Sequence, residues 1–135
     1  MTSISLPSNL TCINKALFEC CYALSTVLLP SGTTKIDEFA FNLCDNLTSI
    51  AIPNSVKTIG DNAFASCKKL KVIQLSASIS SIGKLAFAWC DSLTDINFNG
   101  SKSQWKKLNK DEDWNYELGN YVVHCNDGIL NENGI

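Results

Sequence analysis

The side chains best suited to chemistry in this sequence are its seven cysteines. Four of them recur at intervals of 23 residues: Cys21, Cys44, Cys67 and Cys90. The other three are Cys12, Cys20 and Cys125. A zinc site needs closely paired ligands such as Cys-x-x-Cys, which this spacing does not supply. Equivalent positions in stacked repeats lie about 5 Å apart, within disulfide range, but their side chains point in parallel. We therefore expect reduced, buried cysteines that act as small apolar residues.

Two further groups of residues resemble reactive or metal-binding sites. The single histidine, His124, precedes Cys125, but neighbours on a strand point to opposite faces and do not converge as a catalytic dyad. The acidic run at 111–113 lacks the alternating spacing and glycine of a calcium loop, which favours a solvated turn. We predict no catalytic residues, no metal ligands and no cofactor, and hence a protein that is not an enzyme.

The composition argues against two classes of partner. The net charge is −2, and all eleven basic residues are lysines. Arginine supplies most bidentate recognition of phosphates and bases, so we expect no nucleic-acid partner. No apolar run reaches the roughly 18 residues of a transmembrane helix, so we expect no membrane span. Trp105 and Trp114 fit either an aromatic ligand shelf or, as we favour, a plug at the end of a core.

The cysteine spacing belongs to a repeat that covers most of the chain. Four contiguous units occupy residues 1–23, 24–46, 47–69 and 70–92, and a partial fifth occupies 93–98. A fixed period of this length is typical of a solenoid, in which each unit buries its apolar positions against its neighbours. We assign 1–98 to the solenoid and 99–135 to a C-terminal cap of the same domain.

The pattern within one unit predicts its local structure. The third unit begins with apolar residues that indicate a strand with one buried face, ended by proline: Leu47, Ile50, Ile52 and Pro53. Val56 and Ile59 indicate a second, shorter extended segment. Gly60 follows, where we expect a bend at positive φ. The spacing of apolar residues in 61–67 predicts a short α or 3₁₀ segment. We expect the recurring phenylalanines to form a core ladder: Phe18, Phe41, Phe64 and Phe87.

The pattern LxxIxIPxxVxxIGxxAFxxC resembles the BspA-like branch of the leucine-rich repeats. The unit at 47–69 matches it almost throughout, whereas Leu17 and Ser76 depart from it. The tail, with FNGSKSQWKKL at 98–108 and YVVHCNDG at 121–128, is similar to the capping tail of gut-anaerobe members. The resemblance implies an α/β solenoid, a right-handed superhelix with a parallel β-sheet. It also implies a cell-surface or secreted location and contacts with host or bacterial surface proteins or glycoproteins.

The ends of the chain lead to further expectations. SQWKKLNK predicts a short helix, YVVHC a strand and CNDGIL a turn. We expect Trp105, Trp114, Tyr116 and Tyr121 to cover the apolar end of the solenoid. Met1 stands at a repeat leucine position with no cap before it, which indicates either a fragment of a longer array or self-association through the strand edge at residues 1–6.

The remaining surface is the outward face of the strands, and we predict that any partner binds there. Its members flank the buried strand positions: Ser3, Ser5, Thr26, Leu28, Ser49, Ala51, Val72, Gln74, Asp95 and Asn97. These residues favour a non-enzymatic interaction module, with adhesion as one use. Because the set is small and nearly neutral, a structural spacer that presents another domain of a longer parent protein stays open.

Overall fold

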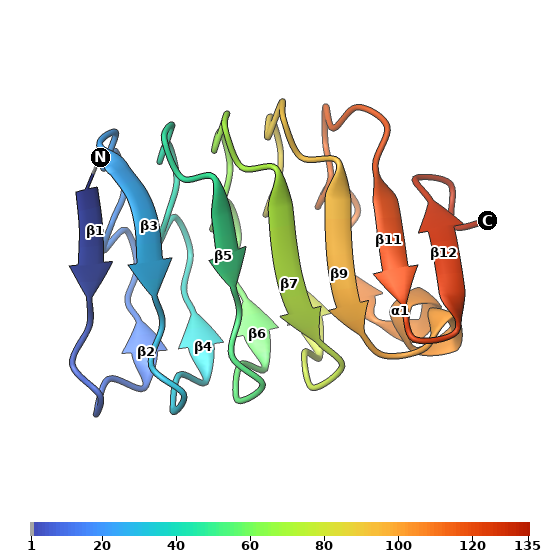
Figure 1. Cartoon of the computed structure of the whole chain (residues 1–135), viewed down its shortest axis with the longest axis horizontal. Helices are drawn as coiled ribbons and strands as arrows, with labels where there is room; N and C mark the ends of the chain where they lie inside the picture. The colour runs from blue at the N-terminus through green and yellow to red at the C-terminus, as the bar shows by residue number, and fades with distance from the viewer. Residues whose placement is uncertain (1) are drawn as a thin grey trace.

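The computed structural model describes residues 2–135 and shows short strands stacked in two layers (Figure 1). The predicted parallel-strand solenoid is confirmed. The front layer in Figure 1 contains β1 (Thr2–Ser5), β3 (Leu24–Leu28), β5 (Ser49–Ala51), β7 (Val72–Ser76), β9 (Asp95–Asn99), β11 (Val122–Cys125) and β12 (Gly128–Asn131). The back layer contains β2 (Cys12–Ile13), β4 (Lys35–Ile36), β6 (Thr58–Ile59), β8 (Ser81–Ile82) and β10 (Asn109–Lys110). Met1 lies outside the described residues.

The register confirms that the units stack column on column. In the front layer Ile50 pairs with Ile73, which pairs with Ile96, and all three side chains are buried. In the back layer the column running from Ile13 to Ile82 is equally buried. Each apolar residue therefore covers its counterpart in the next unit, and the core forms between the two layers.

The front layer is not one continuous sheet. β1 pairs with β3, and β5 begins a second sheet that runs through β7, β9 and β11 to β12. A long hydrogen bond of 3.4 Å from the Thr48 N–H to the Ser25 carbonyl links the two sheets. β3 and β5 still lie side by side, so the outward face passes across the break (Figure 1).

The prediction of a short helical segment in each repeat was wrong. Residues 38–43, 61–66 and their equivalents form successive turns. Alternate N–H groups bond to the next unit: those of Phe39, Phe41 and Leu43 donate to the carbonyls of Asp61, Ala63 and Ala65. These groups are therefore unavailable for a helix. Two residues per repeat adopt positive φ to allow this: Ala16 and Cys20, Phe39 and Leu43, Asn62 and Ser66, Leu85 and Trp89.

The role expected for the glycines was also wrong, because positive φ falls two residues after Gly60 and Gly83, at Asn62 and Leu85. The reason for glycine is close stacking of the units. A Cβ on Gly60 would lie 2.6 Å from the Glu38 backbone nitrogen, nearer than real Cβ atoms approach. These glycines therefore let consecutive turns pack backbone against backbone.

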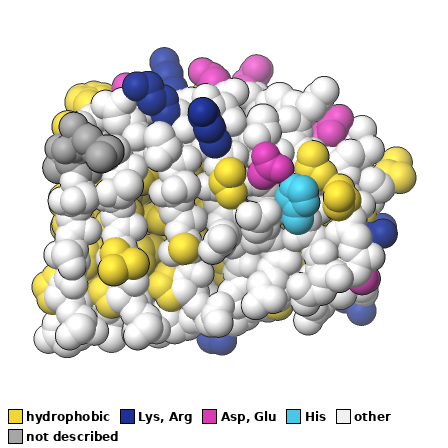
Figure 2. All heavy atoms as spheres, in the orientation of Figure 1, with side chains coloured by type: hydrophobic (Ala, Val, Ile, Leu, Met, Phe, Trp, Pro, Cys, Tyr) yellow, Lys and Arg dark blue, Asp and Glu magenta, His cyan; other side chains and the backbone are white. Residues whose placement is uncertain are grey.

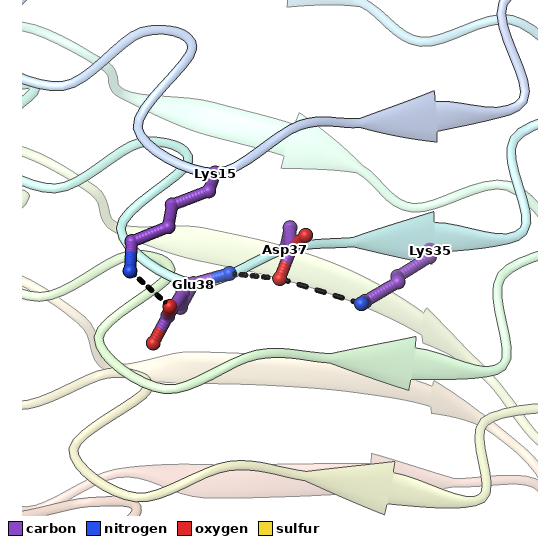
Figure 3. A network of polar contacts seen from close by, with 4 residues as sticks. All are labelled: Lys15, Lys35, Asp37 and Glu38. Carbon is purple, nitrogen blue, oxygen red and sulfur yellow. Dashed lines mark hydrogen bonds and ion pairs between the residues drawn. The ribbon is translucent and has the colours of Figure 1, made fainter.

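The phenylalanine ladder is confirmed as core. Rings of Phe18, Phe41, Phe64 and Phe87 stack with centroids 5.3, 5.2 and 5.3 Å apart. Each such contact contributes about 0.5–1.5 kcal/mol beyond the burial of the ring. At the surface the ion pair between Lys15 and Glu38 joins the first two units, and within the second unit Lys35 lies 3.4 Å from the Asp37 carboxylate (Figure 3).

Residues 99–135 extend both layers. β10 continues the back layer beside β8, and β11 continues the front layer in parallel with β9. The antiparallel strand β12 then follows β11 through a tight turn, as the sequence predicted for CNDGIL. The predicted helix is α1 (Lys102–Lys107), and Ser101 caps it by accepting a 3.1 Å hydrogen bond from the Gln104 N–H.

Lys110 stands where the other units have isoleucine, because it pairs with Ile82 in the back layer. Its amine donates to the carbonyls of Trp105 and Leu108 at 2.6 and 3.3 Å, and lies 4.7 Å from the Trp105 ring centroid. Partial burial lowers the pKa of Lys110. The lysine thus satisfies carbonyls at the end of α1, which no apolar residue at this position would do.

Aromatic residues close the C-terminal end of the core. Trp114 packs edge-on against Phe87, with ring centroids 6.1 Å apart, and also contacts Trp105 and Tyr121. These side chains are buried, which confirms the predicted plug. Tyr116 does not join it: the side chain is 46% exposed and packs against Trp89 instead.

Candidate functional site

The predicted sheet face is a continuous outward surface in the structure. Register and exposure place its members in two rows across the strands, with exposed or half-buried side chains: Ser3, Ser5, Thr26, Leu28, Ser49, Ala51, Val72, Gln74, Asp95 and Asn97. Leu28 is 73% exposed and is the largest apolar side chain in the N-terminal half of this face. The apolar residues between these positions point inward, so strand alternation separates the face from the core.

The face continues beyond the residues that the sequence indicated. Asn97 pairs with His124 of β11, and His124 pairs with Ile129 of β12. Because Val123 is buried, its neighbours Val122 and His124 point outward with the rest of the face. The alternation of apolar residues in YVVHC indicated a strand with one outward side. Because the repeat is interrupted at 99–121, the sequence did not indicate which strand this one lies beside.

His124 forms an ion pair with Asp95 on this face. Its Nε2 lies 2.8 Å from the Asp95 Oδ1, and both side chains are about 40% exposed. The Thr94 hydroxyl donates to the Asp95 Oδ2, also at 2.8 Å. The hydrogen bonds from His124 and Thr94 lower the pKa of Asp95, with the larger effect from His124. The histidine, cyan in Figure 2, and its acidic neighbour lie over the C-terminal half of the face.

Next to this pair the surface is hollowed. The hollow measures about 320 Å³ and lies where β5, β7, β9 and β11 adjoin. Carboxamides and small polar groups line it together with His124: Asn54, Gln74, Ser76, Asn97 and Asn99. Ile52, Leu75 and Phe98 complete the lining. The hollow thus combines hydrogen-bonding groups with a limited apolar floor.

The other chemically suggestive residues are used structurally. His124 engages Asp95, while Cys125 packs partly buried against the core and its pKa is raised by that burial. In the acidic run, the Asp111 carboxylate accepts a hydrogen bond from the Glu112 N–H. Within residues 2–135, no three His, Cys, Asp or Glu side chains gather as metal ligands would.

The regularly spaced cysteines are free thiols, and three of them are fully buried. Each buried thiol donates to the carbonyl of a phenylalanine in the preceding unit: Cys44 to Phe18, Cys67 to Phe41 and Cys90 to Phe64, at 3.2, 3.1 and 3.0 Å. Burial raises the pKa of the Cys44 thiol to about 12. These three buried thiols therefore link consecutive units through hydrogen bonds. Cys21, the equivalent residue in the first unit, is only half-buried.

A second exposed feature lies away from the strand face, on the stacked turns. Trp89 and Tyr116 pack edge to face with centroids 5.6 Å apart, and their side chains are 40% and 46% exposed. The backbone N–H of Trp89 donates to the backbone carbonyl of Tyr116 at 3.1 Å, and this hydrogen bond between stacked turns holds the two residues side by side. Within residues 2–135, no helix is both long and apolar enough to cross a membrane.

Stacked parallel strands, ladders of identical side chains and an exposed strand face define the class of this molecule as a leucine-rich-repeat solenoid. The particular family follows from its sequence. The chain belongs to the BspA type leucine rich repeat family, whose model matches as six copies over residues 1–108. The repeats of this family occur in bacterial surface proteins and are generally non-enzymatic protein-interaction modules.

Solved structures from three bacteria are similar to this chain. A leucine-rich repeat protein of Treponema pallidum is 35% identical over 70% of this chain, with a TM-score of 0.69. A leucine-rich cell surface protein of Faecalibacterium prausnitzii is 28% identical over 79%, with a TM-score of 0.64. A leucine-rich repeat protein of Bacteroides ovatus is 25% identical over 88%, with a TM-score of 0.70.

These matches span 44%, 34% and 30% of the respective chains, so this chain corresponds to less than half the length of each. No curated protein matches the sequence.

Proposed function

We propose that this chain is a non-enzymatic binding module of a bacterial cell-surface or secreted protein, and that it binds a surface protein or glycoprotein through the outward strand face. The observation that carries this proposal is the hollow at the C-terminal half of that face, beside the His124–Asp95 pair. The similarity to a leucine-rich cell surface protein supports the location. Adhesion is one use of such a module.

The distribution of side chains favours the C-terminal half of the face over its N-terminal half. Ser3, Ser5 and Ser49 are small and offer little contact area. Gln74 and His124 are larger and line the hollow, and Val72 pairs with Asp95, the partner of His124. Binding energy concentrates in a few well-packed contacts, so we place the centre of the site on β7, β9 and β11.

An array of purified extracellular proteins and glycoproteins, read by biolayer interferometry, tests this proposal. We expect the double variant V72K/Q74K to lose binding to any partner on the array, because two long charged side chains would then occupy the contact. Ser103→Lys, an exposed site on α1, is the matched control and should bind as the native chain does. All three proteins should melt at similar temperatures.

If a partner binds V72K/Q74K unchanged, the strand face is the wrong surface. The exposed Trp89–Tyr116 pair and the loops at Pro7, Pro30 and Pro53 then become the surfaces to examine.

A structural spacer is the second candidate, and one observation favours it. The chain corresponds to less than half of each similar solved structure, so units like these form part of longer molecules. Under this alternative the face only keeps the repeats soluble. An array on which nothing binds, with the protein folded, would support the spacer and contradict the binding module.

A further inference from the structure

The hollow on the strand face has a lining that is rich in carboxamides and poor in net charge. Asn54, Gln74, Asn97 and Asn99 all border it. We propose that it binds a neutral glycan chain, such as the carbohydrate of a surface glycoprotein. This inference rests on the proposed function, because it names the part of the partner that this site recognises.

The carboxamides match the chemistry of sugar hydroxyls. Each Asn or Gln side chain presents two donors and a carbonyl acceptor, and a hydroxyl is both donor and acceptor. Gln74 and Asn97 are directly paired across β7 and β9, so their amide groups project side by side. Adjacent amides of this kind suit adjacent hydroxyls on one ring, and His124 adds a further ring nitrogen at the end of the row.

The charge of the lining selects against acidic ligands. No lysine lines the hollow, and all basic residues of the chain are lysines. The histidine at its border is already paired with the Asp95 carboxylate. A sulfated, phosphorylated or sialylated chain would therefore find no free cation here, whereas a neutral chain needs none.

The same lining argues against a protein surface as the ligand. Protein hot spots are enriched in Trp, Tyr and Arg, and none of these types lines the hollow. Its apolar floor consists of Ile52, Leu75 and Phe98, which are only 5%, 2% and 4% exposed. This area is too small to anchor a large apolar side chain, but it can contact the C–H groups of a sugar ring.

The extent of the hollow favours an oligosaccharide over a single sugar. Its lining residues come from four neighbouring strands, β5 to β11, or from the loops that directly follow them. At a spacing of about 4.8 Å between strands, they span about 14 Å. The hollow is open to solvent.

An array of neutral and acidic oligosaccharides provides the probe, followed by titration of each bound glycan. We expect neutral glycans to bind and acidic ones to bind less well. Asn97→Leu and Gln74→Met keep the side-chain size but remove the amides, and each should weaken binding about tenfold, the effect of losing one or two hydrogen bonds. Thr26→Val, on the same face but away from the hollow, is the control and should bind normally.

A matched pair of glycoproteins, native and enzymatically deglycosylated, separates this inference from the proposed function. Binding that requires the glycan and is weakened about tenfold in Asn97→Leu supports both. Binding that survives deglycosylation but is lost in V72K/Q74K overturns the glycan inference and leaves the binding module standing. If neutral glycans bind but Trp89→Ala abolishes that binding while Asn97→Leu does not, the hollow is the wrong site and the inference falls. If nothing binds, both fall.

Discussion

Replacing Phe64 with alanine tests whether the aromatic ladder holds the units together. Phe64 is fully buried and lies between Phe41 and Phe87, with ring centroids 5.2 and 5.3 Å away. Phe18, at the end of the ladder, stacks on Phe41 alone among the described rings and is 7% exposed. The two positions therefore differ by one ring contact and by the burial of their neighbours, since Leu17 and Cys21 are exposed and half-buried where Ala63 and Cys67 are buried.

The expected loss in the free energy of unfolding follows from these contacts. A buried Phe→Ala substitution typically costs about 3–5 kcal/mol, and we expect Phe64→Ala to fall in the upper part of that range because it removes two stacked contacts. Phe18→Ala should cost less by at least about 1 kcal/mol, the value of one such contact, because its surroundings are also less buried. Against a typical domain stability of about 5–15 kcal/mol, either loss is large.

Urea unfolding followed by circular dichroism measures both variants, with Phe64→Leu as a control that keeps most of the apolar volume. We expect Phe64→Leu to unfold between the native chain and Phe64→Ala. A midpoint for Phe64→Ala that equals the native value would refute the ladder as core. Equal losses for the variants at Phe64 and Phe18 would show that stacking adds nothing to burial.

Four further predictions follow from the packing. The Cys44 thiol has a pKa raised by burial from 9.0 to about 12, so its contribution to stability should be constant below pH 9 and be lost from there to about pH 12; Cys44→Ala should lessen the alkaline loss of stability in pH-dependent melting. Gly83→Ala should cost about 1–3 kcal/mol in urea unfolding despite its negative φ, because a Cβ there would lie 2.7 Å from the Asp61 nitrogen; native stability would contradict the close stacking. Deleting 99–135 should expose the end of the core and cause aggregation, so a soluble, cooperatively melting remainder would argue against a capping role. Light scattering across a concentration series tests pairing through β1: a rising mass supports it, and a constant monomer mass excludes it.

Local sequence patterns predicted the strands well because each of them has a local cause. The spacing of two residues between Ile50 and Ile52 reflects a strand with one buried face, and Pro53 follows it at once. The candidate face follows from the same alternation, since the residues between buried positions must point outward. The family followed from the repeat in the same way.

The turns of each repeat could not be predicted in this way. Their N–H groups alternate between a local turn and the next unit, as Phe41 does when it donates to the Ala63 carbonyl. Nothing in the local spacing of apolar residues separates this arrangement from a short helix. Positive φ at Leu85 and Trp89 likewise carries no sequence signal, because neither residue type favours it.

The sequence by itself determined the period, the strands, the buried columns and the identity of the outward residues, because a repeat imposes the same surroundings on every copy. Only the tertiary structure decided which strand lies beside β9 after the repeat is interrupted. That neighbour is β11, and it brings His124 to Asp95 across a separation of 29 residues. β11 thereby adds His124 to a hollow whose other lining residues lie on or just after β5, β7 and β9. A contact between segments so far apart in the chain has no periodic signal in the sequence.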